Sequence, residues 1–170
     1  MRQESLTIGR MLSRQLKSVE WNERSIQELA SHIVRKSRQY EVSPYLVLSL
    51  IHVESSFRPT AISGKGAVGM MQLMPETAAE LAANGGLAYH GPGALHDPKL
   101  NIELGIRYIV WLQKKFPTYR HILTAYNIGP AALYKKLKSG EELNLGFYRK
   151  VMGAKRFYER EAKAGDRQWL

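Results

Sequence analysis

Residues 54–77 read ESSFRPTAISGKGAVGMMQLMPET, and this stretch decides how the chain folds. Its first residue, Glu54, ends the apolar segment 44–53, and three glycines follow between positions 64 and 69. Pro75 then stands where a new helix can begin, because proline is favoured in the first helical turn. The stretch therefore predicts a helix end, a glycine-rich loop and a second helix, with one ionisable group at the first junction.

Glu54 is the first candidate for chemistry. On a helix that begins after Ser43, its side chain lies on the same face as Leu50 and Ile51, which are its i−4 and i−3 neighbours. A carboxyl group held against apolar side chains loses hydration, and its pKa rises. Such a group is suited to general acid catalysis near neutral pH. The alternative is a glutamate at a frayed helix end that points into water, and this residue alone does not decide between the two.

The segments around Glu54 narrow the chemistry. The glycine-rich loop is no phosphate-binding loop, because Gly66 rather than Ser or Thr follows Lys65 and no strand precedes it. Further along, the segment AYNIGP at 125–130 places a tyrosine and an asparagine before a Gly-Pro break. A tyrosine and polar amides near a carboxyl group with a raised pKa are typical of a carbohydrate site.

The remaining sequence predicts an all-α fold. Apolar residues recur at helical spacing, and Ser43-Pro44 and Asp97-Pro98 both pair an N-cap residue with a proline at the first helical position. No strand alternation competes, although residues 60–72 leave room for a short hairpin. Predicted helices cover 25–40, the segment from 44, 75–84, the segment from 98, two runs on either side of Gly129-Pro130, and 147–163.

Composition indicates one soluble globular domain. The chain has 170 residues, of which 44% are hydrophobic and 24% charged. It has no cysteine, which excludes disulfides and thiolate metal sites. Residues 1–22 contain no secretory signal, and their scattered apolar side chains predict a short amphipathic helix or a linker rather than a membrane-surface anchor. We therefore expect an N-terminal extension over 1–22 and a main domain over 23–165.

The charge favours an anionic partner. Lys and Arg number 25 against 15 Asp and Glu, a net charge of +10. This balance suits nucleic acid, anionic lipid or anionic wall polymers, and it also suits simple solubility. No nucleic-acid-binding motif accompanies it, so we expect no nucleic acid partner. The five histidines lack the spacing of metal ligands, so we expect neither a metal nor a cofactor.

Two motifs carry a resemblance to a known family. The pattern E-S-S-F-x-P-x-A-x-S-x-x-G-A-x-G-x-M-Q-x-M-P-x-T-A begins at Glu54, and A-Y-N-x-G-P follows at 125–130. Together they resemble the soluble lytic transglycosylase family over roughly residues 25–160. The resemblance implies a lysozyme-like helical fold and an enzyme of bacterial or phage origin that cleaves the glycan strands of peptidoglycan, with residues 23–165 as the catalytic domain.

The resemblance also implies site residues. Glu54 matches the catalytic acid and base of the family, and Met71 is expected either to line the cleft or to pack beneath it. Tyr148 matches a tyrosine of the family on the last helix, but the family's usual residues around it are replaced here by the sequence GFYRKV. The residues that would bind the glycan are Ser63, Gln72, Met74, Tyr126, Asn127 and Tyr148.

The implied mechanism needs one carboxyl group. Glu54 would protonate the departing glycosidic oxygen and then deprotonate the 6-hydroxyl of the sugar, which leaves a 1,6-anhydromuramoyl end without consuming water. Glu80 and Glu103 are expected to be solvated, and Trp111 is expected in the core. The chain would act as a monomer in the cell envelope, with its export signal outside this sequence. A hydrolytic lysozyme and a non-catalytic peptidoglycan-binding module are the alternatives.

Overall fold

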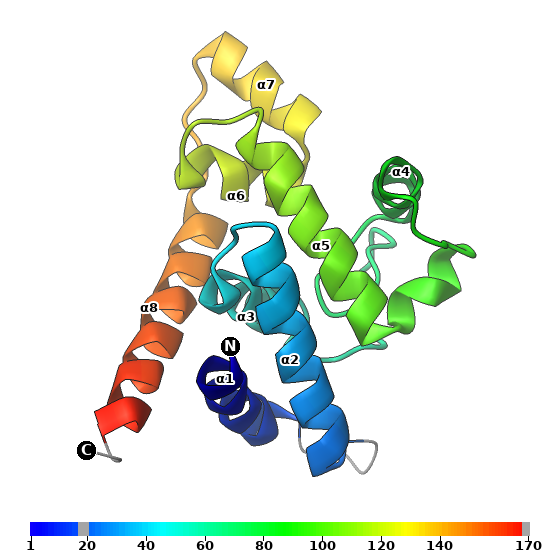
Figure 1. Ribbon diagram of the computed structural model, residues 1–170. Coiled ribbons are helices and arrows are strands. Elements are labelled where there is room, and N and C mark those ends of the chain that lie inside the picture. Colours follow the sequence, from blue (N-terminus) through cyan, green and yellow to red (C-terminus); the bar gives the residue numbers. More distant parts are fainter. Residues whose placement is uncertain (17–20, 168–170) are drawn as a thin grey trace.

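The chain folds into a bundle of helices. The computed structural model describes residues 1–16 and 21–167, with side chains described as far as residue 164. Figure 1 shows α3 in the middle, α8 along one edge and α4 apart on the opposite side. The α-helices are α1 (Arg2–Gln15), α2 (Glu23–Gln39), α3 (Pro44–Ser55), α4 (Pro75–Gly85), α5 (Pro98–Gln113), α6 (Tyr119–Ile128), α7 (Pro130–Ser139) and α8 (Gly146–Arg167), and a short 3-10 helix, η1 (Pro92–His96), precedes α5.

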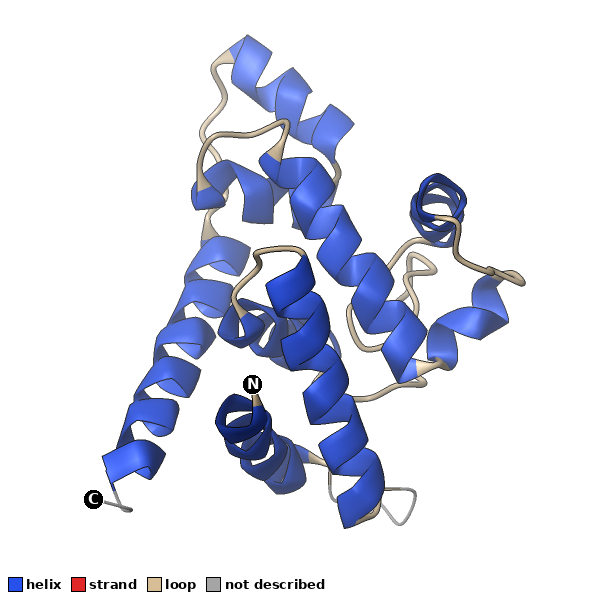
Figure 2. Cartoon of the chain, viewed as in Figure 1, coloured by secondary structure: helices blue, strands red, loops and turns tan. Residues whose placement is uncertain are grey.

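The predicted all-α class is confirmed. Within the described ranges no segment forms a strand of a sheet (Figure 2). The hairpin for which residues 60–72 leave room is reduced to two isolated antiparallel bridges, Ile62 with Val68 and Val68 with Leu73. The glycine-rich loop is therefore a compact turn held by a few main-chain pairs.

Helices α3 and α5 begin at a proline, as predicted. The Asp97 carboxylate accepts a hydrogen bond from the Leu100 amide (2.7 Å), which caps α5. Ser43 precedes Pro44 at the start of α3, but its side chain makes no capping hydrogen bond. The fixed φ of proline, rather than a side-chain cap, is thus the feature shared by both helix starts.

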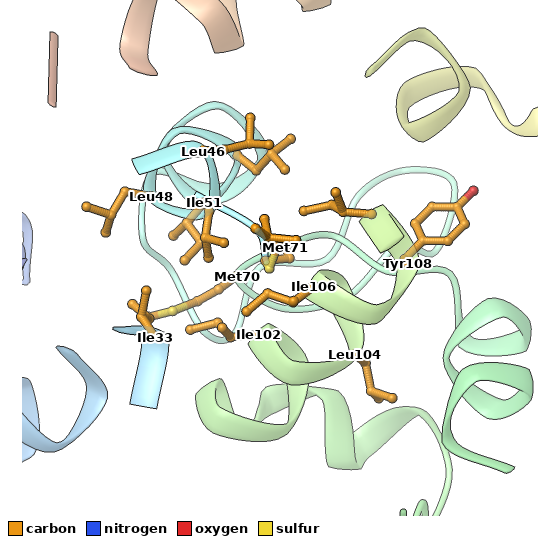
Figure 3. Close-up of a cluster of buried hydrophobic side chains, with 14 of the residues drawn as sticks. Ile33, Leu46, Leu48, Ile51, Met70, Met71, Ile102, Leu104, Ile106 and Tyr108 are labelled. Carbon is orange, nitrogen blue, oxygen red and sulfur yellow. The ribbon is translucent and has the colours of Figure 1, made fainter. Parts of the chain in front are cut away.

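The core forms around α3. Leu46, Leu48 and Ile51 of this helix are completely buried. Figure 3 shows them beside Met70 and Met71 of the glycine-rich loop and beside apolar side chains of α5. Because α3 is buried on nearly all sides, the position and direction of its last turn are fixed by packing.

The N-terminal helix joins the same core. The predicted amphipathic helix is present as α1, which packs against α2 and α8. Its residues Ile8, Met11 and Leu12 are buried. Residues 17–20, which belong to the expected extension over 1–22, lie outside the described residues, and the domain boundary after residue 22 stays a prediction.

Two expectations about single residues are wrong. Glu103 is buried rather than solvated, because Lys36 of α2 (2.8 Å) and Arg107 of α5 (3.2 Å) both pair with it. Burial alone would raise the pKa of Glu103, but the hydrogen bonds from the two cations lower it overall. Trp111 lies at the surface, 37% exposed, where its ring stacks on Tyr108.

No helix in the described part of the chain is both long and apolar enough to cross a membrane.

Candidate active site

Glu54 stands in the last turn of α3, and the local backbone explains why. Ser56 and Phe57 both adopt left-handed conformations, with φ of 51° and 62°. The Ser56 amide caps the helix by donating to the carbonyl oxygens of His52 and Ile51. The buried side chain of Phe57 holds this turn in place. Such conformations are unfavourable for residues other than glycine and persist only where the surrounding packing holds them.

The Glu54 carboxyl group is partly buried, so a frayed helix end pointing into water is the wrong reading. Burial raises its pKa to about 7. Within the described residues no hydrogen bond or ion pair to this carboxyl group offsets the loss of hydration. Near neutral pH the group therefore populates both its protonated and its ionised form, as a residue that first donates and then accepts a proton requires.

Glu54 opens into a cleft of about 530 Å³. Val53 and Glu54 of α3 form one side, and Thr124, Asn127 and Ile128 of α6 form a second side. The rest of the lining comes from α7, the loop after it and the first turn of α8. It consists of Lys136, Glu142, Leu143, Asn144, Gly146, Phe147 and Lys150.

Tyr126 lies behind this cleft rather than in its lining. Its hydroxyl donates a hydrogen bond to the carbonyl oxygen of Met71 (2.8 Å). Burial and, next, the nearby charge of Glu54 raise the pKa of Tyr126 well above its usual value. Its ring lies parallel to that of Phe147, with centroids 6.5 Å apart. Tyr126 thus stays protonated and connects α6 to the glycine-rich loop.

Three of the predicted glycan-binding residues lie in or next to that loop, outside the cleft lining. The Ser63 hydroxyl accepts a hydrogen bond from the Ala67 amide (3.0 Å). The Gln72 side-chain amide donates to the carbonyl oxygens of Ala61 (3.1 Å) and Gly69 (2.9 Å). Ser63 and Gln72 therefore brace the loop. Met74, just before α4, is 38% exposed.

The last predicted position falls beside the cleft. Tyr148 is half-buried near the start of α8, and the cleft lining includes Phe147 and Lys150 instead. Of the seven predicted site residues, the structure thus brings Glu54 and Asn127 together in one cleft, with Tyr126 directly behind it. Met71 is fully buried against Gly105 of α5, where it packs beneath the site.

Asn101 supports the loop, and sequence reasoning missed it. This fully buried amide accepts from the Met71 amide (2.8 Å) and donates to the carbonyl oxygens of Val68 (3.0 Å) and Leu95 (3.1 Å). Gly69 passes so close that an added Cβ would lie 2.2 Å from the Asn101 side chain. One feature of the sequence could have indicated this role: Asn101 is an amide among the apolar residues of the helix that follows Pro98.

Glu142 was also missed. It lies in the loop between α7 and α8 and lines the cleft into which Glu54 opens. Glu80, by contrast, is exposed on α4, and Glu103 is held by its two cations. In the sequence, the position of this second carboxyl group is indicated only by the pair Glu141-Glu142 shortly before the GFYRKV segment. The cleft therefore contains a second carboxyl group that the single-carboxylate mechanism does not use.

Known proteins of one family resemble this chain. A family model described as the transglycosylase SLT domain matches residues 31–144. The membrane-bound lytic murein transglycosylase E of Buchnera aphidicola is 38% identical over 112 residues, which cover 61% of this chain and 51% of that protein. The membrane-bound lytic murein transglycosylase C of Serratia proteamaculans is 34% identical over 125 residues, 67% of this chain and 35% of that protein. The chain thus spans about half or less of these relatives.

Solved structures match as well. The 70 kDa soluble lytic transglycosylase of Escherichia coli superposes with a TM-score of 0.60 at 27% identity, over 78% of this chain and 22% of that one. An inactive mutant of the lytic transglycosylase Slt of Pseudomonas aeruginosa gives a TM-score of 0.61 at 24% identity, over 90% of this chain and 26% of that one. The second likeness concerns the fold alone.

Proposed function

Because the chain belongs to the transglycosylase SLT family, we propose that it is a peptidoglycan lytic transglycosylase. It would cleave the β-1,4 bond between N-acetylmuramic acid and N-acetylglucosamine and leave a 1,6-anhydromuramoyl end. The observation that carries the proposal is the Glu54 carboxyl group, which is partly buried in a cleft, has no ion pair among the described residues and has a pKa raised to about 7. The names of the relatives support the same reaction class.

In the proposed reaction Glu54 acts twice. Its protonated form donates to the glycosidic oxygen as the bond to the muramoyl C1 breaks, while the 2-acetamido group of the sugar stabilises the positive charge that develops. The resulting carboxylate then removes the proton of the 6-hydroxyl, whose oxygen bonds to C1. Glu54 ends protonated, so the cycle closes without water or any other reactant. The bound hydroxyl competes well because its effective concentration exceeds that of a diffusing water.

The other site residues would position the glycan. Asn127 lies in the cleft and presents an amide that can bind a sugar hydroxyl or acetamido group. Ser63, Gln72, Met74 and Tyr148 remain proposed contacts of the glycan beyond this cleft, and Tyr126 would act by holding the loop. Glycan strands would be the partner of a monomer that works in the cell envelope, where the substrate is found.

The substitution Glu54→Gln tests the proposal. The amide keeps the size of the side chain but can neither donate nor remove the required proton. Loss of general acid–base catalysis is worth about 10²- to 10⁴-fold, and both steps depend on this residue. Release of soluble muropeptides from purified peptidoglycan should therefore fall at least a hundredfold, while binding to the insoluble wall and the helical content measured by circular dichroism remain. Glu80→Gln, at an exposed carboxylate on α4, is the matched control and should keep full activity.

A hydrolytic lysozyme is the second candidate, and one observation favours it. Glu142 lines the same cleft as Glu54, and hydrolytic glycosidases ordinarily use two carboxyl groups, one of which activates water or acts as the nucleophile. A non-catalytic wall-binding module is the third reading. It requires that wild type and Glu54→Gln release equal, background amounts of muropeptide.

A further inference from the structure

Helix α8 packs with only one side against the rest of the molecule. It contacts α3, α6 and α1, and Figure 1 shows it along the edge of the fold. The side chains of Val151, Tyr158 and Ala162 form its buried side. His52 Nδ1 and the Tyr158 hydroxyl share a hydrogen bond (2.8 Å), which links α8 to α3. The helix is thus a rigid support whose opposite side faces solvent.

The outer side of α8 carries a row of cations. Arg149, Arg156, Arg160 and Lys163 are separated by seven, four and three residues. At 3.6 residues per turn these spacings place all four on one face of the helix, over about 20 Å of its length. All four are exposed, and Phe157 between them is 45% exposed. These five residues are called the basic face below.

Two acidic residues of α8, Glu159 and Glu161, are engaged by cations outside this face. Glu159 pairs with Lys155, and Glu161 pairs with Arg14 of α1 at 2.8 Å. In the part of the chain that the structure describes, none of the four cations of the basic face pairs with a carboxylate. Their charges therefore act together on whatever approaches α8.

We infer that the basic face docks the protein on a membrane surface rich in anionic lipid. This inference goes beyond the proposed reaction and concerns a different surface. Basic side chains beside an exposed aromatic ring match a headgroup layer, which offers negative charge at the surface and apolar material just below it. A linear polyanion would satisfy the charges but would leave Phe157 without a role. Each cation near such a membrane strengthens binding by about fivefold.

The basic face of α8 adjoins the cleft that contains Glu54. Lys150, the residue after Arg149, lines the catalytic cleft, so the basic face begins where the cleft wall ends. A molecule docked through α8 would hold its cleft beside the membrane surface. Glycan strands that lie close to the membrane would then be presented to Glu54 in preference to distant ones.

Vesicle binding tests the inference. The full chain is sedimented with vesicles of phosphatidylcholine containing 30% phosphatidylglycerol, and with vesicles of phosphatidylcholine alone, at about 0.1 M salt. We expect binding to the anionic vesicles only. Replacing Arg149, Arg156, Arg160 and Lys163 by Gln should weaken binding more than a hundredfold. The control replaces four other exposed cations, Lys114, Arg120, Lys135 and Lys138, and should stay within tenfold of wild type.

A second variant separates a membrane from a polymer. Phe157→Ala should weaken binding to anionic vesicles severalfold and leave binding to inorganic polyphosphate unchanged. Equal losses in the two quadruple variants would overturn the inference, because net charge rather than this face would then decide. Tighter binding to polyphosphate or duplex DNA than to vesicles, with no effect of Phe157→Ala, would assign the face to a phosphate polymer and would overturn it as well.

Discussion

The hydroxyl of Tyr126 donates a hydrogen bond to the carbonyl oxygen of Met71 over 2.8 Å, and so ties α6 to the glycine-rich loop. Tyr126 lies at the centre of the A-Y-N motif, next to Asn127 in the cleft. The proton of its hydroxyl is nevertheless engaged by the main chain of the loop. We therefore assign it to positioning the site.

Tyr126→Phe should lower stability without a large change in shape. The substitution leaves the Met71 carbonyl oxygen buried without its donor, which costs about 1–3 kcal/mol. In a domain of this size that loss lowers the melting temperature by roughly 2–4 °C for each kcal/mol. Thermal unfolding measures it, with Tyr148→Phe at a half-buried position as the control. An unchanged melting temperature in Tyr126→Phe would show that the bond contributes nothing.

Asn101→Ala should be more damaging. It removes the partner of the Met71 amide and of the Val68 and Leu95 carbonyl oxygens, so we expect a loss of about 3 kcal/mol or more. Activity should fall with it, because the loop rests against the helix that carries Glu54 through the bond from Ser55 to Met70 (2.8 Å). Denaturant unfolding is the measurement. Asn84→Ala, at an exposed position on α4, should change stability by less than about 0.5 kcal/mol.

The raised pKa of Glu54 predicts how stability depends on pH. Burial raises this pKa from 4.5 to about 7, so the folded state holds the proton more firmly than the unfolded state. The contribution of this group to stability is therefore fully present below about pH 4.5 and is lost as the pH rises through 7. Glu54→Gln removes the titration. Its melting temperature should match that of wild type near pH 4.5 and exceed it at pH 8.5.

Glu80→Gln serves as the control for that comparison and should follow the wild-type curve at both values of pH. A Glu54→Gln variant that loses stability relative to wild type at pH 8.5 would contradict the assignment of a desolvated, unpaired carboxyl group. The same titration predicts that activity falls as the pH rises above about 7, because the general acid is then deprotonated.

Glu142→Gln addresses the second carboxyl group. In a transglycosylase Glu142 has no proton to move, and we expect activity within about threefold of wild type and the same products. In a hydrolase that uses Glu142 to activate water, activity should fall by about 10²-fold or more. Chromatography of the soluble muropeptides distinguishes the two outcomes.

Much of this architecture follows from local signals. The proline-started helices and the end of α3 next to Glu54 depend on neighbours a few positions away, and the sequence predicts them, but these local patterns leave open whether the Glu54 side chain is buried or points into water. Asn101 and Glu142 depend on contacts between distant segments. Asn101 meets a loop 30 residues earlier in the chain, and no local pattern predicts that pairing.

The errors have the same cause. Glu103 is buried by its pairing with Lys36 of another helix, which no pattern along α5 indicates, and Trp111 lies at the surface although it belongs to a long apolar run. The direction of an α5 side chain depends on which helices cover α5. Tertiary packing decides this, and hydrophobic periodicity along one helix does not.

Digestion of peptidoglycan in ¹⁸O-water, followed by mass spectrometry of the fragments, tests the proposed function most directly. If Glu54 regains a proton from the 6-hydroxyl, the new ends are 1,6-anhydromuramoyl groups and carry no label. If water attacks instead, the new ends are reducing sugars that carry ¹⁸O. We predict unlabelled anhydro ends from the wild type and from Glu142→Gln. Labelled reducing ends as the major product of the wild type would contradict it and would identify a lysozyme.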